Sequence, residues 1–332
     1  MSAGRPKLLL RLDAGSAGLG HAVRTAGLVD LLDPHPELLL VGRGEGLAEK
    51  FPAVRRCEEV DAESFASLCR RERPDAVLVD LPRYDAEFFK NLRRAGAPII
   101  CIDDWGGDVD ADLVINGTVI DGYHHYPLLS SGAVLSGGDY TLIRPQFGRT
   151  PWKDPVQPGV VVIVGSGERA TEWAWRLLDI DRSGWGRTSM IVGGAFPDRE
   201  EFASQAAARQ VGFHHGLSGD ELANRLSEAT LTLITGGMVV YEAMAVGVPS
   251  VVFPQLRNLV VEAEFLSGLG CIEDLGFEGG MDPARVSASV SGLLADSGRR
   301  KQMSKRQRSL IDGRGMERAA KAISRFLQEG PR

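Results

Sequence analysis

The chain has 332 residues, and its 43% of hydrophobic and 25% of charged residues argue against a disordered or fibrous protein. Its net charge of -6, from 44 acidic and 38 basic residues, argues against bulk affinity for nucleic acid or an anionic membrane. The length predicts two domains of about 150 residues each. A small molecule is therefore the expected partner.

The four cysteines are scattered without a CxxC spacing, which is typical of reduced thiols in a cytosolic protein and offers no metal site. Residues 1–15 lack the apolar run of a signal peptide, and no stretch approaches about 18 apolar residues. We therefore expect a cytoplasmic protein without membrane insertion, and we expect neither a metal nor a cofactor. The sequence leaves the oligomeric state open.

Short apolar runs alternate with longer amphipathic stretches in the first half of the chain. This pattern is typical of a parallel sheet with helices on both faces. Apolar residues at helical spacing predict helices over 21–33 and 61–73. The predicted strands of this half are 7–13, 37–43, 75–81, 98–104 and 112–117.

A proline-rich stretch at 144–159, with four prolines and no periodicity, predicts the linker between two domains. The same alternation then resumes, and the segment 282–327 is predicted to be helical throughout. The predicted strands of the second half are 159–167, 189–194, 231–237 and 249–254. We predict two doubly wound α/β domains, one over 1–147 and one over 155–332.

A glycine-rich loop, from Asp13 to Arg24, follows the first predicted strand. In open α/β sheets ligands bind beyond the carboxyl ends of strands, and glycines such as Gly18 and Gly20 let the backbone approach them. His21 then begins a helix, whose positive end disfavours the imidazolium, so a neutral His21 could act as a general base. Asp13 could orient the imidazole or bind substrate, and Arg24 lies one turn along the helix. A plain strand-to-helix turn is the alternative.

A second glycine pair, Gly236 and Gly237, joins a predicted buried strand to a helix. The first amides of that helix, including that of Met238, point outward with a partial positive charge that can hold a diphosphate without lysine. Glu242 lies further along the same helix, which is otherwise almost entirely apolar, and its carboxylate could bind both hydroxyls of a ribose. The alternative for Glu242 is a solvent-facing side chain.

The segment 236–254 resembles the nucleotide-sugar binding motif of the GT-B fold superfamily, and the segment 11–24 resembles the opening motif of one branch of it. Within it, the chain resembles the UDP-sugar hydrolases of the pseudaminic acid pathway and their spore coat polysaccharide relatives. The matching pieces include the acidic pair Asp103 and Asp104 and the segment 137–147, and they occur in family order over nearly the whole chain.

The resemblance implies two domains that face an interdomain cleft, with the base and sugar on the first domain and the nucleotide on the second. It implies that His21 activates water to attack the anomeric carbon of a UDP-linked diamino-deoxysugar, with inversion and loss of UDP. The implied substrate-binding residues are Asp13, Gly18, Gly20, Arg24, Asp103, Asp104, Asn116, Tyr140 and Arg144. The implied nucleotide-binding residues are Gly165, Ser166, Gly167, Gly236, Gly237, Met238, Glu242 and Asn258.

The chain departs from the family pattern at two places. Leu259 and Glu262 stand where relatives commonly have Gln and Asn, so a polar contact to sugar or phosphate is lost there. The loop 165–167 also differs from the Gly-Gly-Ser-Asp of many relatives. Both changes affect the predicted ligand site and leave the exact sugar open.

Two other functions fit the same motifs. A GT-B glycosyltransferase would use the same base to activate an acceptor hydroxyl instead of water. A membrane-working transferase would show an apolar patch edged with basic residues, whereas the basic runs 70–74 and 91–96 are interpreted as solvated helix ends. A non-catalytic nucleotide-sugar binding protein is the other alternative. A dehydrogenase is disfavoured, because neither glycine cluster has dinucleotide spacing.

Overall fold

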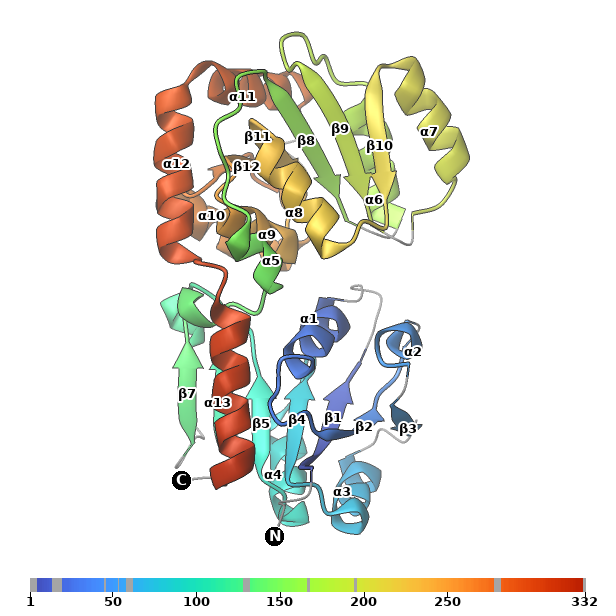
Figure 1. Cartoon of the computed structure of the whole chain (residues 1–332), viewed down its shortest axis with the longest axis vertical. Coiled ribbons are helices and arrows are strands. Elements are labelled where there is room, and N and C mark those ends of the chain that lie inside the picture. The colour runs from blue at the N-terminus through green and yellow to red at the C-terminus, as the bar shows by residue number, and fades with distance from the viewer. Residues whose placement is uncertain are drawn as a thin grey trace. The chain divides into compact units, whose positions relative to one another are not determined.

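The computed structural model describes residues 5–13, 20–44, 46–52, 54–57, 62–127, 132–165, 168–193, 196–277 and 282–330. The chain divides into two compact units, which Figure 1 draws in one colour sequence. Unit 1 comprises Met1–Leu142 and Arg314–Arg332, and unit 2 comprises Ile143–Gly313. Each unit contains one parallel sheet covered by helices.

The sheet of unit 1 has seven parallel strands in the order β3-β2-β1-β4-β5-β6-β7. Its strands are β1 (Lys7–Leu12), β2 (Glu37–Val41), β3 (Arg55–Cys57), β4 (Ala76–Asp80), β5 (Ile99–Ile102), β6 (Leu113–Asn116) and β7 (Ala133–Ser136). Its helices are α1 (Gly20–Val29), α2 (Leu47–Lys50), α3 (Ala62–Glu72), α4 (Ala86–Ala95) and α13 (Gly315–Glu329), with the 3-10 turns η1 (Asp121–Tyr123) and η2 (Gly138–Tyr140).

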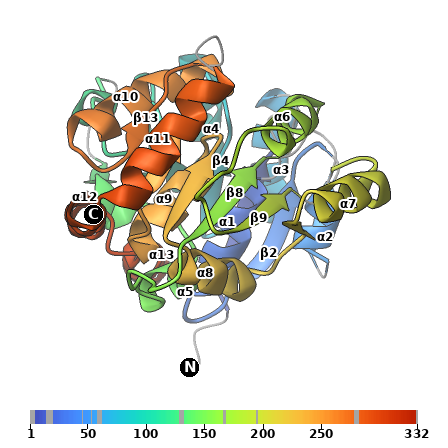
Figure 2. The ribbon, with the colours of Figure 1, turned by 90° about the horizontal axis from the view of Figure 1, so that it is seen from above.

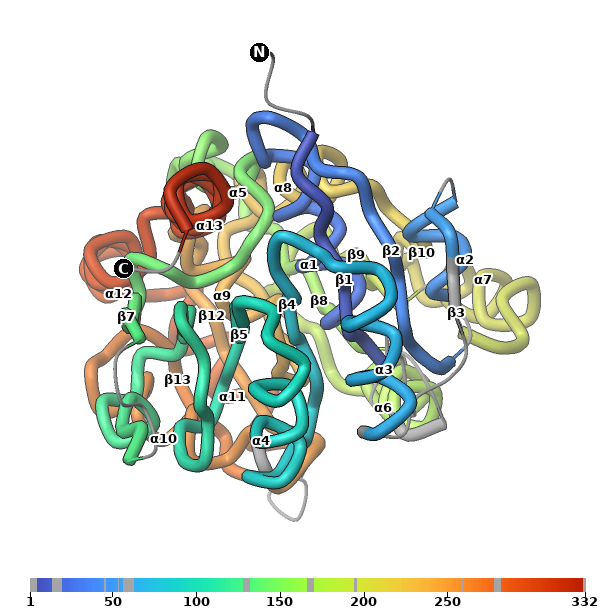
Figure 3. The backbone as a smooth tube through the Cα atoms, turned by 90° about the horizontal axis from the view of Figure 1, so that it is seen from below, coloured from blue at the N-terminus to red at the C-terminus, as the bar shows by residue number. Residues whose placement is uncertain are grey.

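Alternate residues of β1 build the two apolar layers of unit 1. Leu8 and Leu10 pack in one buried cluster with residues of α1 and α13, whereas Leu9 packs in another with residues of α3 and α4. This follows from the period of two in a strand, which sends successive side chains to opposite faces. Figure 3 shows α13 on one side of the sheet and α3 and α4 on the other. The sheet is thus buried on both faces.

The sheet of unit 2 has six parallel strands in the order β10-β9-β8-β11-β12-β13. The strands are β8 (Gly159–Val164), β9 (Arg187–Val192), β10 (Val211–His215), β11 (Leu231–Ile234), β12 (Ser250–Val252) and β13 (Glu273–Asp274). The helices are α5 (Pro145–Arg149), α6 (Glu168–Leu178), α7 (Arg199–Ala208), α8 (Gly219–Glu228), α9 (Met238–Val246), α10 (Val260–Gly268), α11 (Pro283–Ala295) and α12 (Ser297–Leu310), with the turn η3 (Arg257–Leu259).

The core of unit 2 is layered in the same way. Val160 and Val162 of β8 share a buried cluster with Trp173 of α6 and Val290 of α11. Helices α8 and α9 pack against strands β8, β11 and β12. Figure 2 shows α6 and α11 on one side of this sheet and α8 on the other. The predicted fold class, two doubly wound α/β units with parallel sheets, is confirmed.

The boundaries between the units differ from the predicted 1–147 and 155–332. Unit 2 begins at Ile143, before the proline-rich stretch, because helix α5 of that stretch packs on α8 and α9. The segment 282–327 is helical, as predicted, but it does not belong wholly to the second domain. It forms α11, α12 and α13, and α13 returns to unit 1, where Met316 and Ile323 are fully buried beside α1.

Candidate functional site

Both sheets reverse their strand order at one place, between β1 and β4 in unit 1 and between β8 and β11 in unit 2. The connections that leave these neighbouring strands run to opposite sides, which leaves room for a ligand beyond their carboxyl ends. In unit 1 this position receives the start of α1 and the end of β4. In unit 2 it receives Gly165, the residue after β8, and the glycines that precede α9.

His21, in the first turn of α1, meets Asp80, the last residue of β4. The Nδ1 atom of His21 lies 2.7 Å from Oδ1 of Asp80, whose side chain is fully buried. A carboxylate only accepts hydrogen bonds, so Nδ1 carries the proton of this bond. In the neutral imidazole, Nε2 then keeps its lone pair. The pair therefore presents a histidine in the tautomer that a general base requires.

Arg24, one turn after His21, connects this pair to a second carboxylate. Its guanidinium donates to Oδ1 of Asp80 at 2.6 Å and to Oδ2 at 2.9 Å. It also donates to both oxygens of Asp104, at 2.8 and 2.9 Å. Thr25 adds a 2.6 Å hydrogen bond to Asp80. Such bidentate pairs fix both position and orientation, so the carboxylate that holds His21 is itself rigidly held.

The charges of this network determine its ionisation. Burial would raise the pKa of Asp80, but the adjacent Arg24 and the His21 contact hold that pKa well below its ordinary value. Burial lowers the pKa of Arg24, whereas Asp104 and Asp80 raise it, and the net shift is upward. Asp80 therefore remains a carboxylate and Arg24 a cation. Because the side chain of Asp104 is 29% exposed, it remains accessible to a ligand.

Asp103 and Asn116, two of the predicted substrate-binding residues, are buried inside unit 1. Asp103 accepts hydrogen bonds from the hydroxyls of Tyr84 and Tyr126. Asn116 donates to Asp103 at 3.2 Å and to Tyr126 at 2.8 Å. Their polar atoms thus connect the loops that follow β4, β5 and β6. In the structure, Asp103 and Asn116 therefore hold these loops in place through contacts within the protein.

Asp13 and Tyr140 also have partners inside unit 1. Asp13 accepts from Arg11 at 2.6 and 3.1 Å and from the backbone amide of Arg43 at 3.0 Å. The carboxylate that orients His21 is thus Asp80, a residue that the sequence analysis missed. Tyr140 packs against the buried cluster that contains Leu142. Of the predicted residues of this unit, His21, Arg24 and Asp104 are brought together in one network.

In unit 2, helix α9 begins directly at the predicted glycine pair. Gly236 and Gly237 have φ values of 99° and 83°, which favour glycine, and no described side chain caps the helix. The first amides of α9, including that of Met238, have no partner within the helix, and the helix dipole adds a partial positive charge there. This helix start can bind a phosphate group. Gly165 lies nearby, with its amide 3.4 Å from Oγ1 of Thr235.

Glu242 of α9 is paired with Arg144, which the sequence analysis assigned to the first domain. Oε1 of Glu242 accepts from Nη2 of Arg144 at 2.9 Å and from Nε at 3.3 Å, and both residues belong to unit 2. The guanidinium lies 5.0 Å from the centre of the Phe147 ring. Burial raises the pKa of Glu242, and Arg144 opposes this shift. The Glu242 side chain is 13% exposed, so it can still contact a ligand.

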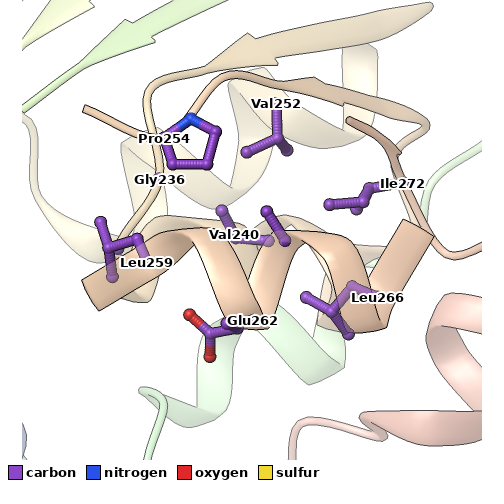
Figure 4. Close-up of a pocket in the computed structure, with 10 residues that line it drawn as sticks. Gly236, Val240, Val252, Pro254, Leu259, Glu262, Leu266 and Ile272 are labelled. Carbon is purple, nitrogen blue, oxygen red and sulfur yellow. The ribbon is translucent and has the colours of Figure 1, made fainter. Parts of the chain in front are cut away.

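An apolar pocket lies beside the glycine pair (Figure 4). The φ of 99° disfavours a residue with a side chain at Gly236, and a Cβ atom there would lie 2.9 Å from Cδ1 of Leu259. Leu259 therefore makes an apolar contact where relatives commonly carry Gln. The carboxylate of Glu262 points away from Val252 and Ile272 (Figure 4). Leu259 and Glu262, the altered pair, thus both line the pocket beside the glycine pair.

Several predicted ligand-binding residues lie outside the described part of the chain: Gly18, Ser166 and Gly167. Asn258 lies in η3, but its side chain is also outside the described part. Gly20, the first residue of α1, is exposed. Among the residues that the structure describes, no three His, Cys, Asp or Glu side chains are grouped to hold a metal ion. No helix in the same residues has the length and apolar character to span a membrane.

No known family model matches the chain. It is 21% identical over 328 residues to the spore coat polysaccharide biosynthesis protein SpsG of Bacillus subtilis (strain 168), an alignment that covers 94% of this chain and 95% of the relative. The solved structure of MurG from Acinetobacter baumannii matches with a TM-score of 0.70 and 15% identity, over 96% of this chain and 100% of the other.

Two further solved structures have the same fold. The calicheamicin glycosyltransferase CalG4 matches with a TM-score of 0.64 and 17% identity, over 99% of this chain and 100% of the other. The MnaA protein of S. aureus, solved with UDP, matches with a TM-score of 0.61 and 15% identity, over 97% of each chain.

Proposed function

We propose that this chain, which shares the fold of MurG and of the glycosyltransferase CalG4, is an enzyme acting on a nucleotide-sugar, with the general base on unit 1 and the nucleotide site on unit 2. The observation that supports this proposal best is the 2.7 Å contact between His21 and the buried Asp80. A buried carboxylate that fixes the tautomer of a partly exposed histidine is the arrangement of a general base.

The proposed reaction is a single displacement at the anomeric carbon. An oxygen nucleophile gives its proton to Nε2 of His21 and forms a bond to that carbon. The bond from the carbon to the phosphate oxygen breaks, and its electron pair leaves with the nucleoside diphosphate. Asp80 stabilises the imidazolium that forms, because it is the carboxylate hydrogen-bonded to Nδ1. The configuration at the anomeric carbon inverts.

Unit 2 is the proposed nucleotide site. The first amides of α9 would hold the diphosphate, and Glu242 would accept hydrogen bonds from the ribose hydroxyls. A UDP complex of the S. aureus protein with this fold supports a uridine nucleotide. The side chain of Leu259 presents apolar surface beside Gly236 and offers no hydrogen bond to the nucleotide there. We therefore expect the backbone amides and Glu242 to supply most of the nucleotide affinity.

The nucleophile distinguishes two candidate functions. Transfer to an acceptor hydroxyl is our first assignment, because a protein that shares the fold over 99% of this chain is described as a glycosyltransferase. Hydrolysis is the second, and it is favoured by the resemblance of the segment 11–24 to the opening motif of the UDP-sugar hydrolases. His21 can act as the base in both reactions, because water and an alcohol each lose an O–H proton when they attack.

A panel of nucleotide-sugars tests the proposal and separates the two functions. UDP-, CMP-, CDP- and GDP-sugars are incubated with the protein, first in water and then with simple sugar acceptors, and nucleotide release is measured. Release that requires an acceptor identifies a transferase, and release in water alone identifies a hydrolase. Binding of UDP-sugars without release in either case would leave a non-catalytic binding protein and would contradict the proposed reaction.

A further inference from the structure

Trp105 is a large apolar side chain that unit 1 leaves open to solvent. Its residue is 45% exposed, whereas Trp173 and Trp185 are 3% and 1% exposed. Trp105 directly follows Asp104 in the loop after β5, and Asp104 is hydrogen-bonded to Arg24 of the His21 network. Since neighbouring Cα atoms are about 3.8 Å apart, Trp105 lies beside this network.

The loop holds Trp105 in a fixed position. The backbone amides of Trp105 and Gly106 donate to Oδ2 of the buried Asp103, at 3.1 and 2.6 Å. Gly106 has a φ of 75°, and a Cβ there would lie 2.7 Å from the carbonyl oxygen of Tyr123. Glycine is therefore required for the close approach of the two loops. Hydrogen bonds to Asp103 thus fix the backbone that carries the exposed indole.

Tyr123, from the turn η1, completes an aromatic pair with Trp105. The centres of the two rings are 5.5 Å apart, and the ring planes are inclined by 56°. The backbone carbonyl of Tyr123 accepts a 2.9 Å hydrogen bond from the buried Asn116, which fixes this second loop as well. Trp105 is exposed and Tyr123 is half-buried, and aromatic rings held in this way bury large apolar area when a ligand covers them.

The charges around the pair indicate which ligand fits. Three acidic residues lie close to the pair in sequence: Asp104 is partly exposed, Asp108 is exposed, and the side chain of Asp121 is fully exposed. Asp104 is paired with Arg24, and Oδ1 of Asp121 lies 3.9 Å from Nδ1 of His124. Carboxylates accept hydrogen bonds from hydroxyl and amino groups and repel anions. A sugar ring has an apolar face of C–H groups and a rim of hydroxyls, so it matches an aromatic pair edged by acids. An anionic membrane surface or a carboxylate-bearing sugar does not.

We propose that Trp105 and Tyr123 form the stacking surface for the sugar ring of the substrate, and that this surface selects neutral or amino-substituted sugars over acidic ones. The proposal rests on the proposed nucleotide-sugar function and adds the substrate class. It assigns Trp105 and Tyr123 to sugar binding and leaves the nucleotide contacts unchanged. Trp105 thus contributes to the affinity for a nucleotide-sugar and not to the affinity for free UDP.

The test compares UDP, UDP-N-acetylglucosamine and UDP-glucuronic acid on the wild type and on Trp105→Ala, Trp105→Phe and Trp175→Phe. We expect Trp105→Ala to weaken binding of UDP-N-acetylglucosamine about tenfold with UDP unchanged, and Trp105→Phe to recover most of the loss. Trp175→Phe, a change at a packed tryptophan of unit 2, should leave both affinities unchanged. The wild type should bind UDP-glucuronic acid more weakly than UDP-N-acetylglucosamine.

Acrylamide quenching of tryptophan fluorescence gives a direct readout on the folded protein, because Trp105 is the most exposed of the five tryptophans. UDP-N-acetylglucosamine should protect the quenchable fraction in the wild type, UDP should not, and Trp105→Phe should lack that fraction. If UDP-N-acetylglucosamine did not protect Trp105 from acrylamide, and if Trp105→Ala bound this nucleotide-sugar with wild-type affinity, the stacking surface would be overturned and the proposed function would not. Failure of the wild type to bind any nucleotide-sugar would overturn the proposed function and this inference together.

Discussion

The two units use one topology for two kinds of chemistry. In both sheets the strand order reverses beside the first strand of the unit, at β1 and β4 or at β8 and β11. In unit 1 the strand ends there bear ionised side chains, and His21, Arg24 and Asp80 form one network. In unit 2 the corresponding strand ends bear Gly165, Gly236 and Gly237. The topology therefore supplies the position of a site, and the strand-end residues supply its chemistry.

This difference predicts how each unit responds to substitution. Side chains carry the chemistry of unit 1, so single substitutions there should have large effects on turnover or on folding. Backbone amides, which only a substitution by proline removes, carry much of the proposed site in unit 2. Substitutions there should have smaller effects, confined to nucleotide affinity.

The largest effect is expected from His21→Ala. Loss of a general base typically lowers turnover about 10²- to 10⁴-fold, and nucleotide release by this variant should fall by that range. Affinity for UDP should stay unchanged, since the nucleotide site belongs to unit 2. The control is His35→Ala, at an exposed residue of the same unit. If the turnover of His21→Ala stayed within severalfold of the wild type, His21 would not be the general base.

Asp80→Ala should reduce the free energy of unfolding of unit 1 by about 3–5 kcal/mol, because the buried Arg24 cation loses a partner. Urea denaturation followed by circular dichroism measures this loss. Glu87→Ala, at an exposed ion pair of the same unit, should cost less than about 1 kcal/mol. Equal costs for the two variants would mean that the network contributes no more than a surface ion pair.

Glu242→Ala should weaken UDP binding by about 1–3 kcal/mol, the usual scale for a lost hydrogen bond to a charged group. Isothermal titration calorimetry with UDP measures the change, and the stability of unit 1 should be unaffected. Glu228→Ala, at the end of α8 in the same unit, serves as the control. An unchanged UDP affinity in Glu242→Ala would mean that Glu242 does not bind the ribose.

The smallest effect concerns pH. UDP affinity should fall as the pH drops through the raised pKa of Glu242, because the protonated carboxyl is a weaker acceptor. Arg144→Gln removes the cation that opposes this shift, so the pKa rises further and the fall begins at a higher pH. The ionisation of UDP is common to both proteins and cancels in the comparison. Coincident pH profiles would show that Arg144 does not influence Glu242.

Burial explains which strands the sequence predicts. All nine predicted strands are present, and they are the strands with a hydrogen-bonded neighbour on both sides, which read as continuous apolar runs. The unpredicted strands of the described chain, β3, β7, β10 and β13, are the edges of the two sheets. Edge strands carry polar residues, as His214 and His215 do in β10, and such short runs have no distinctive apolar pattern.

The sequence could predict individual residues of the candidate site, but it could not predict which of them are in contact. His21 and Arg24 follow from the strand-end and helix-start pattern, and Asp104 follows from the family resemblance, whereas the partner of His21 lies 59 residues away. Asp80 is the last residue but one of the predicted strand 75–81, so its position was available. Choosing it over Asp13 requires the knowledge that β4 is the neighbour of β1. Arg144 and Glu242 are 98 residues apart and pose the same problem.

The anomeric configuration of the product tests the central claim most directly. Proton NMR of a reaction started from a UDP-sugar resolves the anomeric proton of the first product before it equilibrates. A single displacement by an oxygen that His21 deprotonates predicts an inverted first product for the wild type and a rate of product formation about 10²- to 10⁴-fold lower for His21→Ala. Retention of configuration, or the same product formed at the wild-type rate by His21→Ala, would contradict the proposed role of unit 1.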